Sequence, residues 1–72
     1  MRKWLKDIRD SKGLTQEQVA VLSDISRSHY TNIEKGTKTP SVDVAKRIAK
    51  QLGFDWTIFF KQESSLKEQK AM

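Results

Sequence analysis

The segment spanning residues 14–36 constrains the fold more than any other part of the chain. It begins Leu-Thr-Gln-Glu-Gln-Val-Ala and ends Ile-Ser-Arg-Ser-His-Tyr-Thr-Asn-Ile-Glu-Lys-Gly. Thr15 with Gln18 three residues later matches a capping box, and Ser26 is a second residue of the N-cap type. The segment therefore predicts two short helices joined by a tight turn, with the small residue Ala20 where they cross.

Helix boundaries elsewhere are marked by the same kinds of residue. Gly13, Gly36 and Gly53 each follow a segment with helical periodicity, where a residue that accepts positive φ can end a helix. Ser41 and Asp55 are N-cap types that precede further periodic segments. No segment shows sustained alternation of apolar and polar residues. These signals predict an all-α domain with helices at residues 2–12, 16–23, 27–35, 42–52 and 56–62.

Apolar residues fall on one face of each expected helix when successive positions are placed about 100° apart. We expect these stripes to form the core, with Trp4 at its edge. A ligand site built from the aromatic residues at 54–60 is the weaker interpretation, because such stripes usually serve packing. The predicted core comprises Leu5, Ile8, Leu14, Val19, Leu22, Ile25, Tyr30, Ile33, Val42, Ala45, Ile48, Ala49, Leu52, Phe54, Trp56, Phe59 and Phe60.

Three apolar residues lie outside these stripes, namely Val21, Val44 and Ile58. Isolated apolar residues at a surface are common and mean little alone. Ile58 lies opposite the core-facing side of the last expected helix, where two copies of a small domain can meet. Ile58 is therefore a candidate dimer contact, with an ordinary exposed residue as the alternative.

The composition narrows the classes of partner. The chain has 72 residues, enough for one small domain, and its lack of cysteine excludes disulfides and thiolate zinc sites and suits a reducing cytoplasm. No apolar stretch approaches membrane-spanning length, and no signal peptide is expected. Lysine and arginine number 14 against 9 acidic residues, which gives a net charge of +5. This charge favours a polyanionic partner, although a merely soluble basic surface would have the same balance.

The expected helix at 27–35 carries apolar and polar residues on opposite sides. Tyr30 and Ile33 point toward the core. The major groove of DNA suits the other side, since arginine pairs with guanine, asparagine with adenine and hydroxyls with several bases. Residues nearest the helix N-terminus reach deepest into the groove. The alternative interpretation is that this side is simply a solvated helix face. The candidate base-reading strip, in which Arg27 comes first, comprises Arg27, Ser28, Thr31 and Asn32.

Candidate phosphate contacts surround this strip. Thr15 and Gln16 open the preceding helix, whose unpaired amides and positive dipole end favour an anion, although capping alone would also explain Thr15. The other candidates could each be ordinary surface residues. The single histidine has no second ligand at hand, so no metal site is expected. These other candidates are His29, Lys35, Lys38 and, on the flank, Lys12.

Taken together, the motifs resemble the phage lambda Cro/CI-type helix-turn-helix family. Residues 5–60 contain the two runs quoted above, followed by Thr-Pro-Ser and Ile-Ala-x-x-Leu-Gly. The resemblance implies a compact five-helix domain, usually a dimer on a roughly palindromic operator, that acts as a repressor or switch regulator. It also implies that Gln16 contacts the DNA backbone and that Arg27 and Ser28, with the position of Asn32, reach bases.

The resemblance further implies a structural brace and marks two departures. Family members often pair an arginine of the first helix with the glutamate that closes the third, here Arg9 and Glu34, and removing one partner of a partly buried pair is costly. The turn position that the family usually gives to glycine is Asp24, which adopts a left-handed conformation less easily. Ser23 stands where a small or apolar residue is usual. These departures concern the geometry of the turn, not the presence of the motif.

The chain is expected to form one DNA-binding domain at residues 1–60, followed by a tail at 61–72. The tail is polar with mixed charge, so we expect it to be flexible, with a short helix begun by Ser65 and Glu68 as the weaker alternative.

The sequence favours a sequence-specific transcriptional regulator of bacterial or phage type. It would bind double-stranded DNA as a homodimer and act as a repressor in the cytoplasm. A protein antagonist would be a further partner. The alternative is a protein-interaction module of the same fold, such as an antitoxin, in which DNA binding is secondary. An enzyme is not supported, since no nucleophile elbow, phosphate loop or metal-ligand spacing is present. We expect no cofactor, no metal and no membrane association.

Overall fold

The computed structural model describes residues 1–61, and no strand occurs among them. The helices are α1 (Lys3–Ser11), α2 (Gln16–Leu22), α3 (Arg27–Lys35) and α4 (Val42–Leu52), and residues 58–61 are also helical. The bounds predicted for the third and fourth helices are confirmed, and the first two helices end within a residue of prediction. A turn occupies residues 56–57 where the last helix was expected to begin, and the tail beyond residue 61 lies outside the described residues.

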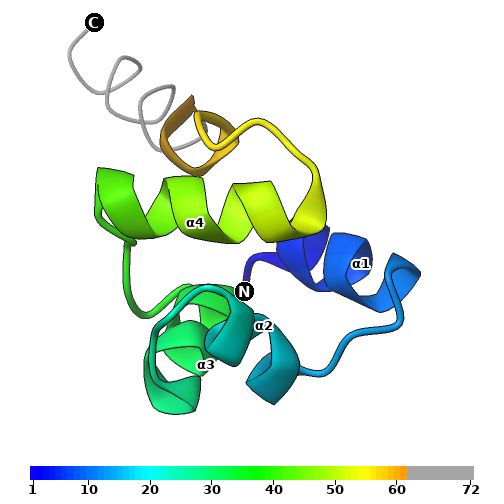
Figure 1. The fold of residues 1–72 in the computed structure, drawn as a ribbon. Helices are drawn as coiled ribbons and strands as arrows, with labels where there is room; N and C mark the ends of the chain where they lie inside the picture. The colour runs from blue at the N-terminus through cyan, green and yellow to red at the C-terminus, as the bar shows by residue number, and fades with distance from the viewer. Residues whose placement is uncertain (62–72) are drawn as a thin grey trace, which may run out of the picture.

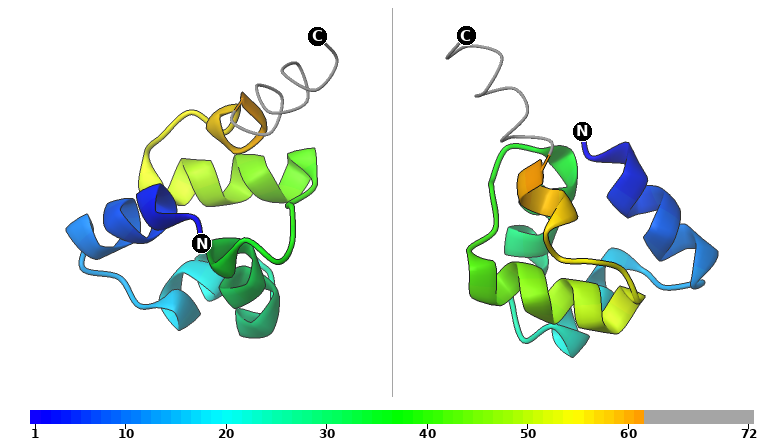
Figure 2. Two further views of the ribbon diagram at one scale, coloured as in Figure 1. Left: turned by 180° about the vertical axis from the view of Figure 1, so that it is seen from behind. Right: turned by 90° about the horizontal axis from the view of Figure 1, so that it is seen from above.

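The helices are arranged around α4 (Figure 1). The pair α2 and α3 lies on one side of α4, and the helical turn at 58–61 crosses its other side. Two further views show α1 beside the C-terminal end of α4 and the N-terminus near the end of α3 (Figure 2). This arrangement leaves α2 and α3 together at one end of the molecule.

Side-chain caps fix the starts of α2, α3 and α4 as predicted. Gln18 N donates to Thr15 Oγ1 at 3.1 Å, and Thr15 N donates to Gln18 Oε1 at 2.8 Å, which completes the capping box. The hydroxyl of Ser26 accepts from a backbone N–H of α3, and that of Ser41 accepts from one of α4. Each of these caps satisfies a backbone donor that the helix itself leaves unpaired.

The turn between α2 and α3 has the tight geometry that the motif requires. Asp24 adopts a left-handed conformation with φ 58°, which confirms that aspartate fills the position usually given to glycine. Ile25 N donates to Ala20 O at 3.0 Å, and this bond closes the turn back onto α2. The departure from the family pattern at Asp24 therefore preserves the turn.

The core collects the inward faces of all the helices. Half-buried apolar side chains that pack against it include Ile8, Leu14, Ile25, Phe54, Trp56 and Phe60, all of which were predicted to be core residues. The fully buried apolar residues are Leu5, Val19, Ala20, Tyr30, Ile33, Ala45, Ile48, Ala49, Leu52 and Phe59.

Three predictions about the core are wrong. Leu22 and Val42 were expected inside but remain 50% and 48% exposed. Leu22 is the last residue of α2 and Val42 the first of α4, and a helix end extends past the neighbours that cover the middle of the helix. Val44 was expected outside but packs on the core, because it lies one turn before Ile48 on the same face of α4.

An aromatic cluster joins α1 to the C-terminal part of the domain. The ring of Trp4 lies edge-on to Phe54 and Phe59, with centroids 5.3 and 5.1 Å apart. Such edge-to-face pairs add about 0.5–1.5 kcal/mol each beyond the area that they bury. Trp4 lies at the edge of the core as expected, and from there it connects the two ends of the described chain.

Replacing Ser23 by alanine is expected to raise the free energy of unfolding by about 1 kcal/mol. The Ser23 side chain is 1% exposed, and its hydroxyl has no hydrogen-bond partner within the described part of the chain. A buried hydroxyl without a partner costs about 1–3 kcal/mol, and alanine removes it while leaving only a small gap. Thermal unfolding should show the midpoint rising by about 4–8 °C. A lower midpoint would show that the hydroxyl has a partner.

Candidate nucleic-acid interface

The N-terminal end of α3 presents its polar side chains to solvent. Tyr30 and Ile33 are fully buried on the inward face, whereas Arg27 and Ser28 are exposed on the outward face. The two sides therefore separate as the helical periodicity predicts. The outward side of the first turn of α3, which Ser26 caps, is exposed at Arg27 and Ser28 and can enter a groove.

The other two residues of the strip are half-buried, and the Thr31 side chain already has a hydrogen-bond partner. Thr31 Oγ1 donates to Gln16 Oε1 at 3.1 Å, which links α3 to the start of α2. The main-chain carbonyl of Asn32 accepts from Gly36 N at 3.1 Å and from Lys38 N at 3.2 Å, which folds the following loop back on α3. Arg27 and Ser28 are thus more available than Thr31 and Asn32.

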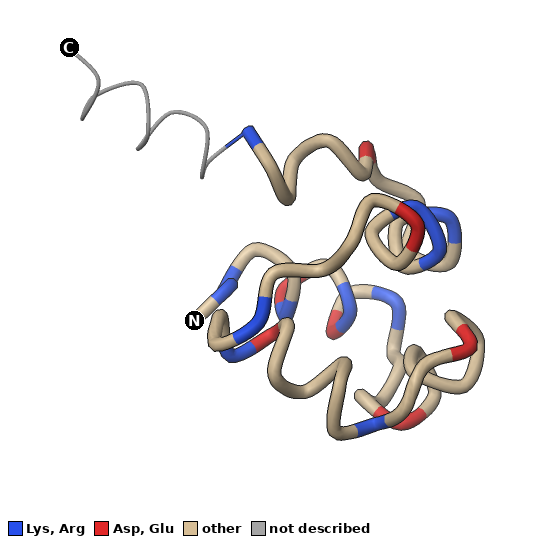
Figure 3. Tube along the Cα trace, turned by 90° about the vertical axis from the view of Figure 1, so that its left-hand side faces the viewer, with Lys and Arg blue, Asp and Glu red and all other residues tan. Residues whose placement is uncertain are grey.

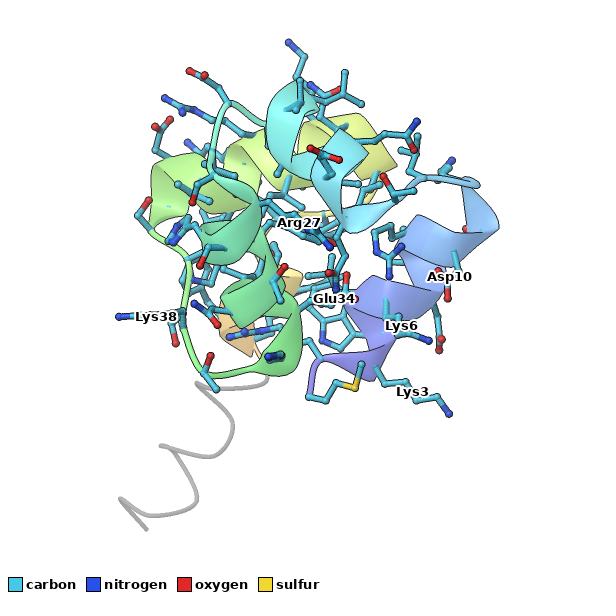
Figure 4. The ribbon with its side chains drawn as sticks, turned by 90° about the horizontal axis from the view of Figure 1, so that it is seen from below. Lys3, Lys6, Asp10, Arg27, Glu34 and Lys38 are labelled. Atoms are coloured by element: carbon cyan, nitrogen blue, oxygen red, sulfur yellow. The ribbon has the colours of Figure 1, made fainter. Side chains whose placement is uncertain are left out.

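A buried ion pair braces α3 against α1. Arg9 Nε donates to Glu34 Oε2 at 2.9 Å and Arg9 Nη2 donates to Glu34 Oε1 at 3.1 Å, so the contact is bidentate. Glu34 is 1% and Arg9 8% exposed. Glu34 points between α3 and α1 (Figure 4). The pair expected from the family resemblance is present, and its burial is deeper than the partial burial that was expected.

Glu34 is also the centre of a larger network. Gln16 Nε2 donates to Glu34 Oε1 at 3.0 Å, and Tyr30 Oη donates to Glu34 Oε2 at 2.8 Å. Arg9 Nη1 donates to the carbonyl of Leu14 at 2.8 Å, ahead of α2. The network therefore fixes α1, α2 and α3 to one another, and it holds the Gln16 amide at the start of α2.

The network controls the titration of its members. Burial alone would raise the pKa of the Glu34 carboxyl, but hydrogen bonds from Arg9, Gln16 and Tyr30 outweigh it and hold that pKa below its ordinary value. The Glu34 carboxylate raises the pKa of Arg9, which stays charged. Burial, followed by the bond to Glu34, raises the pKa of Tyr30, which stays neutral.

The free energy of unfolding is expected to fall as the pH drops below about 4. The pKa of Glu34 is lower in the folded state than in the unfolded chain, so the unfolded chain binds more protons at this residue. The charged carboxylate therefore stabilises the fold fully at pH values above the unfolded pKa of about 4.3. This stabilisation is lost as the pH falls through the folded pKa. Denaturant unfolding between pH 2 and 7 measures this dependence. The double variant Arg9→Met with Glu34→Leu, which leaves neither charge unpaired, should show a shallower acid limb, and an unchanged limb would contradict the role of Glu34.

The candidate phosphate contacts divide into two groups. Lys35 and Lys38 are exposed around the end of α3, and Lys38 extends away from the body of the molecule in Figure 4. Thr15 is exposed and His29 half-buried, and the two lie at the starts of α2 and α3. Lys12 is also exposed and follows the end of α1, with its Nζ close to Gly53 at the end of α4.

Arg2 is a residue of this region that sequence reasoning missed. Its backbone N donates to the Glu34 carbonyl at 2.8 Å, and its Nη1 donates to the carbonyls of Ile33 and Lys38. Figure 3 shows basic positions of the N-terminal segment beside those around the end of α3. Arg2 precedes α1 and belongs to no helical stripe, so periodicity carried no signal for it.

Other kinds of site are not evident in the described residues. Within residues 1–61, no three histidine or acidic side chains lie together so as to hold a metal ion. None of the helices in that part of the chain is long and apolar enough to cross a membrane. The outward part of α2 and α3 is thus the main candidate site.

Comparison with known proteins identifies the family. A family model described as Helix-turn-helix (HTH_3) matches residues 5–59. The chain belongs to this Cro/CI-type helix-turn-helix family. Membership makes it a helix-turn-helix transcriptional regulator by family. The matched residues include α2, α3, α4 and all of α1 after Trp4, so the family resemblance noted in the sequence is confirmed over nearly all of the described domain.

Relatives of this helix-turn-helix chain include regulators and a phage repressor. It is 62% identical over 60 residues to the uncharacterized HTH-type transcriptional regulator YqaF of Bacillus subtilis, covering 83% of this chain and 79% of that protein. It is 33% identical over 67 residues to the immunity repressor protein of Bacillus phage phi105, covering 93% of this chain but 46% of the repressor. The control protein C.BamHI of Bacillus amyloliquefaciens is 38% identical over 50 residues, 68% of this chain and 62% of that protein.

Solved structures share the fold. The clp gene regulator ClgR from Corynebacterium glutamicum superposes with a TM-score of 0.70 at 22% identity, over 93% of this chain and 71% of that one. An HTH_3 family transcriptional regulator from Vibrio cholerae gives 0.69 at 29% identity, over 90% of this chain and 36% of that one. The helix-turn-helix architecture is therefore the common element.

Proposed function

We propose that this protein is a sequence-specific repressor that binds double-stranded DNA with α3 in the major groove. The observation that carries the proposal is the exposed first turn of α3, with Arg27 and Ser28, on a helix whose far end is fixed by the buried Arg9–Glu34 pair. A rigid helix with free polar side chains at its N-terminus suits base recognition. The phage immunity repressor among its relatives supports the direction of regulation.

Roles follow from exposure and hydrogen bonding. Arg27 and Ser28 contact base edges, while Thr31 and Asn32, which are half-buried, make secondary contacts. Gln16 has one amide N–H beyond its bond to Glu34 and offers it to a phosphate. The remaining phosphate contacts proposed for the DNA backbone are Thr15, His29, Lys35 and Lys38.

We further propose that two copies bind one operator. Ile58 is half-buried, and the neighbouring Trp56 and Phe60 rings, 5.9 Å apart, are also half-buried on the same terminal segment. An apolar side chain such as Ile58 that the domain leaves partly uncovered can be covered by the same segment of a second copy. The two α3 helices would then enter successive major grooves about 34–36 Å apart.

Selection from a random duplex library tests the proposal. The full chain should enrich a roughly palindromic site and bind it about 10³-fold or more tightly than random duplex. Sedimentation of the complex should give two chains per duplex, and Ile58→Glu should weaken the dimer without unfolding the domain. The absence of any enriched sequence would contradict the DNA-binding proposal, whereas a non-palindromic site bound by one chain would contradict only the dimer.

A protein-interaction module is the second candidate, and one observation favours it. Val21 is 71% exposed, and with Leu14 and Leu22 it lines a shallow, mainly apolar hollow of about 380 Å³ on the outer side of α2. Exposed apolar patches often mark protein contacts, such as the antagonist expected from the sequence. Val21→Lys should leave DNA binding intact and abolish such a contact. We propose that the protein acts in the cytoplasm. Affinity capture from a cytoplasmic extract, carried out with the wild type and with this variant, separates the two functions.

A further inference from the structure

We propose that Arg2 is a positioning residue for DNA binding, which holds the end of α3 and the following loop so that Lys35 and Lys38 meet phosphates. This inference rests on the proposed DNA-binding function. It gives a residue outside the helix-turn-helix motif a role in the contacts with the DNA backbone.

Arg2 completes the C-terminal end of α3. The last carbonyls of a helix lack partners within the helix and need other donors. Arg2 N donates to the Glu34 carbonyl at 2.8 Å, and Arg2 Nη1 donates to the Ile33 carbonyl. Backbone and side chain of one residue thus satisfy successive carbonyls in the last turn of α3.

The same guanidinium holds the loop that follows α3. Arg2 Nη1 donates to the Lys38 carbonyl at 2.9 Å. From the other side, Lys38 N and Gly36 N donate to the Asn32 carbonyl at 3.2 and 3.1 Å. The loop is therefore fixed between the last turn of α3 and Arg2, which adds a connection that α3 alone does not supply.

Arg2 is itself anchored to α1 and to the core. The N–H groups of Leu5 and Lys6 donate to the Arg2 carbonyl at 3.1 and 3.2 Å, so Arg2 forms the start of α1. Its guanidinium carbon lies 5.6 Å from the centroid of the Phe59 ring, which is 1% exposed and contacts Trp4. A planar guanidinium can face a ring and donate several bonds together, which a lysine ammonium cannot reproduce.

Two lysines near Gly36, one before it and one after it, are the residues that this arrangement would hold in position for phosphate contact. Lys35 is the last residue of α3 and Lys38 lies in the loop, and both are exposed. Gly36 adopts a left-handed conformation with φ 88°, which turns the chain between them. A loop already held in one conformation loses less entropy when its lysines contact phosphates, so binding is tighter.

Binding of the selected duplex and of a scrambled duplex across salt concentrations tests the proposal. Arg2→Gln should weaken both complexes by roughly 2- to 30-fold, the range for residues that act without touching the ligand. The slope of log affinity against log salt should decrease by about 2, because both lysine contacts are lost. The matched control Lys3→Gln removes the same charge one residue further on and should change the slope by at most about 1.

A double-mutant cycle separates positioning from direct contact. Lys38→Gln should weaken binding in the wild-type background and have little further effect in the Arg2→Gln background. Additive losses, with a slope change of about 1, would show that Arg2 contacts phosphate itself and would overturn the proposal. Thermal unfolding shows whether Arg2→Gln is folded at the temperature of the binding measurement.

Arg2→Lys provides the second variant if Arg2→Gln does not fold. It keeps the charge but not the planar group that donates to Ile33 and Lys38. We expect its salt slope to be lowered, as in Arg2→Gln. Unchanged affinity and slope in a folded Arg2 variant would overturn the positioning role, whereas failure of the wild-type chain to bind any duplex would contradict the proposed function beneath it.

Discussion

Replacing Glu34 by alanine is expected to lower the free energy of unfolding by about 3–5 kcal/mol, the usual cost of leaving one partner of a buried ion pair uncompensated. The variant leaves Arg9 without its bidentate partner and removes the acceptor of Gln16 and Tyr30. A domain of this size has a total stability of only about 3–9 kcal/mol. Denaturant unfolding at 25 °C should therefore find the variant marginally folded or unfolded.

Two controls separate the buried pair from ordinary surface charge. Asp10 lies 3.4 Å from Arg9 but its side chain is 52% exposed, so Asp10→Ala should cost less than about 1 kcal/mol. The double variant Arg9→Met with Glu34→Leu removes both charges together and should recover part of the loss. A loss below about 1 kcal/mol for Glu34→Ala would contradict the bracing role of the pair.

Arg27→Ala is expected to weaken binding to the selected site by about 1–3 kcal/mol and to relax the preference at one base pair. Arg27 is exposed at the start of α3, so its loss should leave the free energy of unfolding almost unchanged. Competition binding against duplexes carrying each base at each position measures both effects. Affinity and base preference that stay unchanged would show that another residue reads that base pair.

Lys35→Ala serves as the matched control for Arg27→Ala. Lys35 is an exposed cation on the same helix, but we place it against the DNA backbone. Its loss should weaken the selected and scrambled duplexes alike and lower the salt slope by about 1. A difference between the two variants in sequence dependence, rather than in total affinity, is the result that distinguishes base reading from phosphate contact.

The parts of the fold encoded locally could be predicted from the sequence. Capping residues and glycines act within one turn of the chain, so the bounds of α3 and α4 and the cap at Thr15 follow directly from them. The exposure of Leu22 and Val42 depends on where neighbouring helices stop. A helical wheel shows which side of a helix a residue faces, but not how far the neighbouring helices extend along it.

The arrangement of the candidate site could be predicted where its residues lie on one helix, and it was missed where the contacts join distant segments. The outward position of Arg27 follows from the periodicity of α3. The contacts of Arg2 with the end of α3 connect residues more than 30 positions apart, and no spacing rule indicates them. Gln16 was assigned to phosphate from its place at the start of a helix and from the resemblance, while its bond to Glu34 depends on how α2 packs on α3.

Amide shifts of the isotopically labelled full chain, titrated with the selected duplex and with a scrambled duplex of equal length, test the central claim most directly. We predict that the selected duplex perturbs residues 27–32 of α3 most strongly, and that the scrambled duplex perturbs chiefly the surroundings of Gln16, Lys35 and Lys38. Largest changes on α4 or at residues 56–61, with α3 unaffected by either duplex, would contradict recognition of bases by α3.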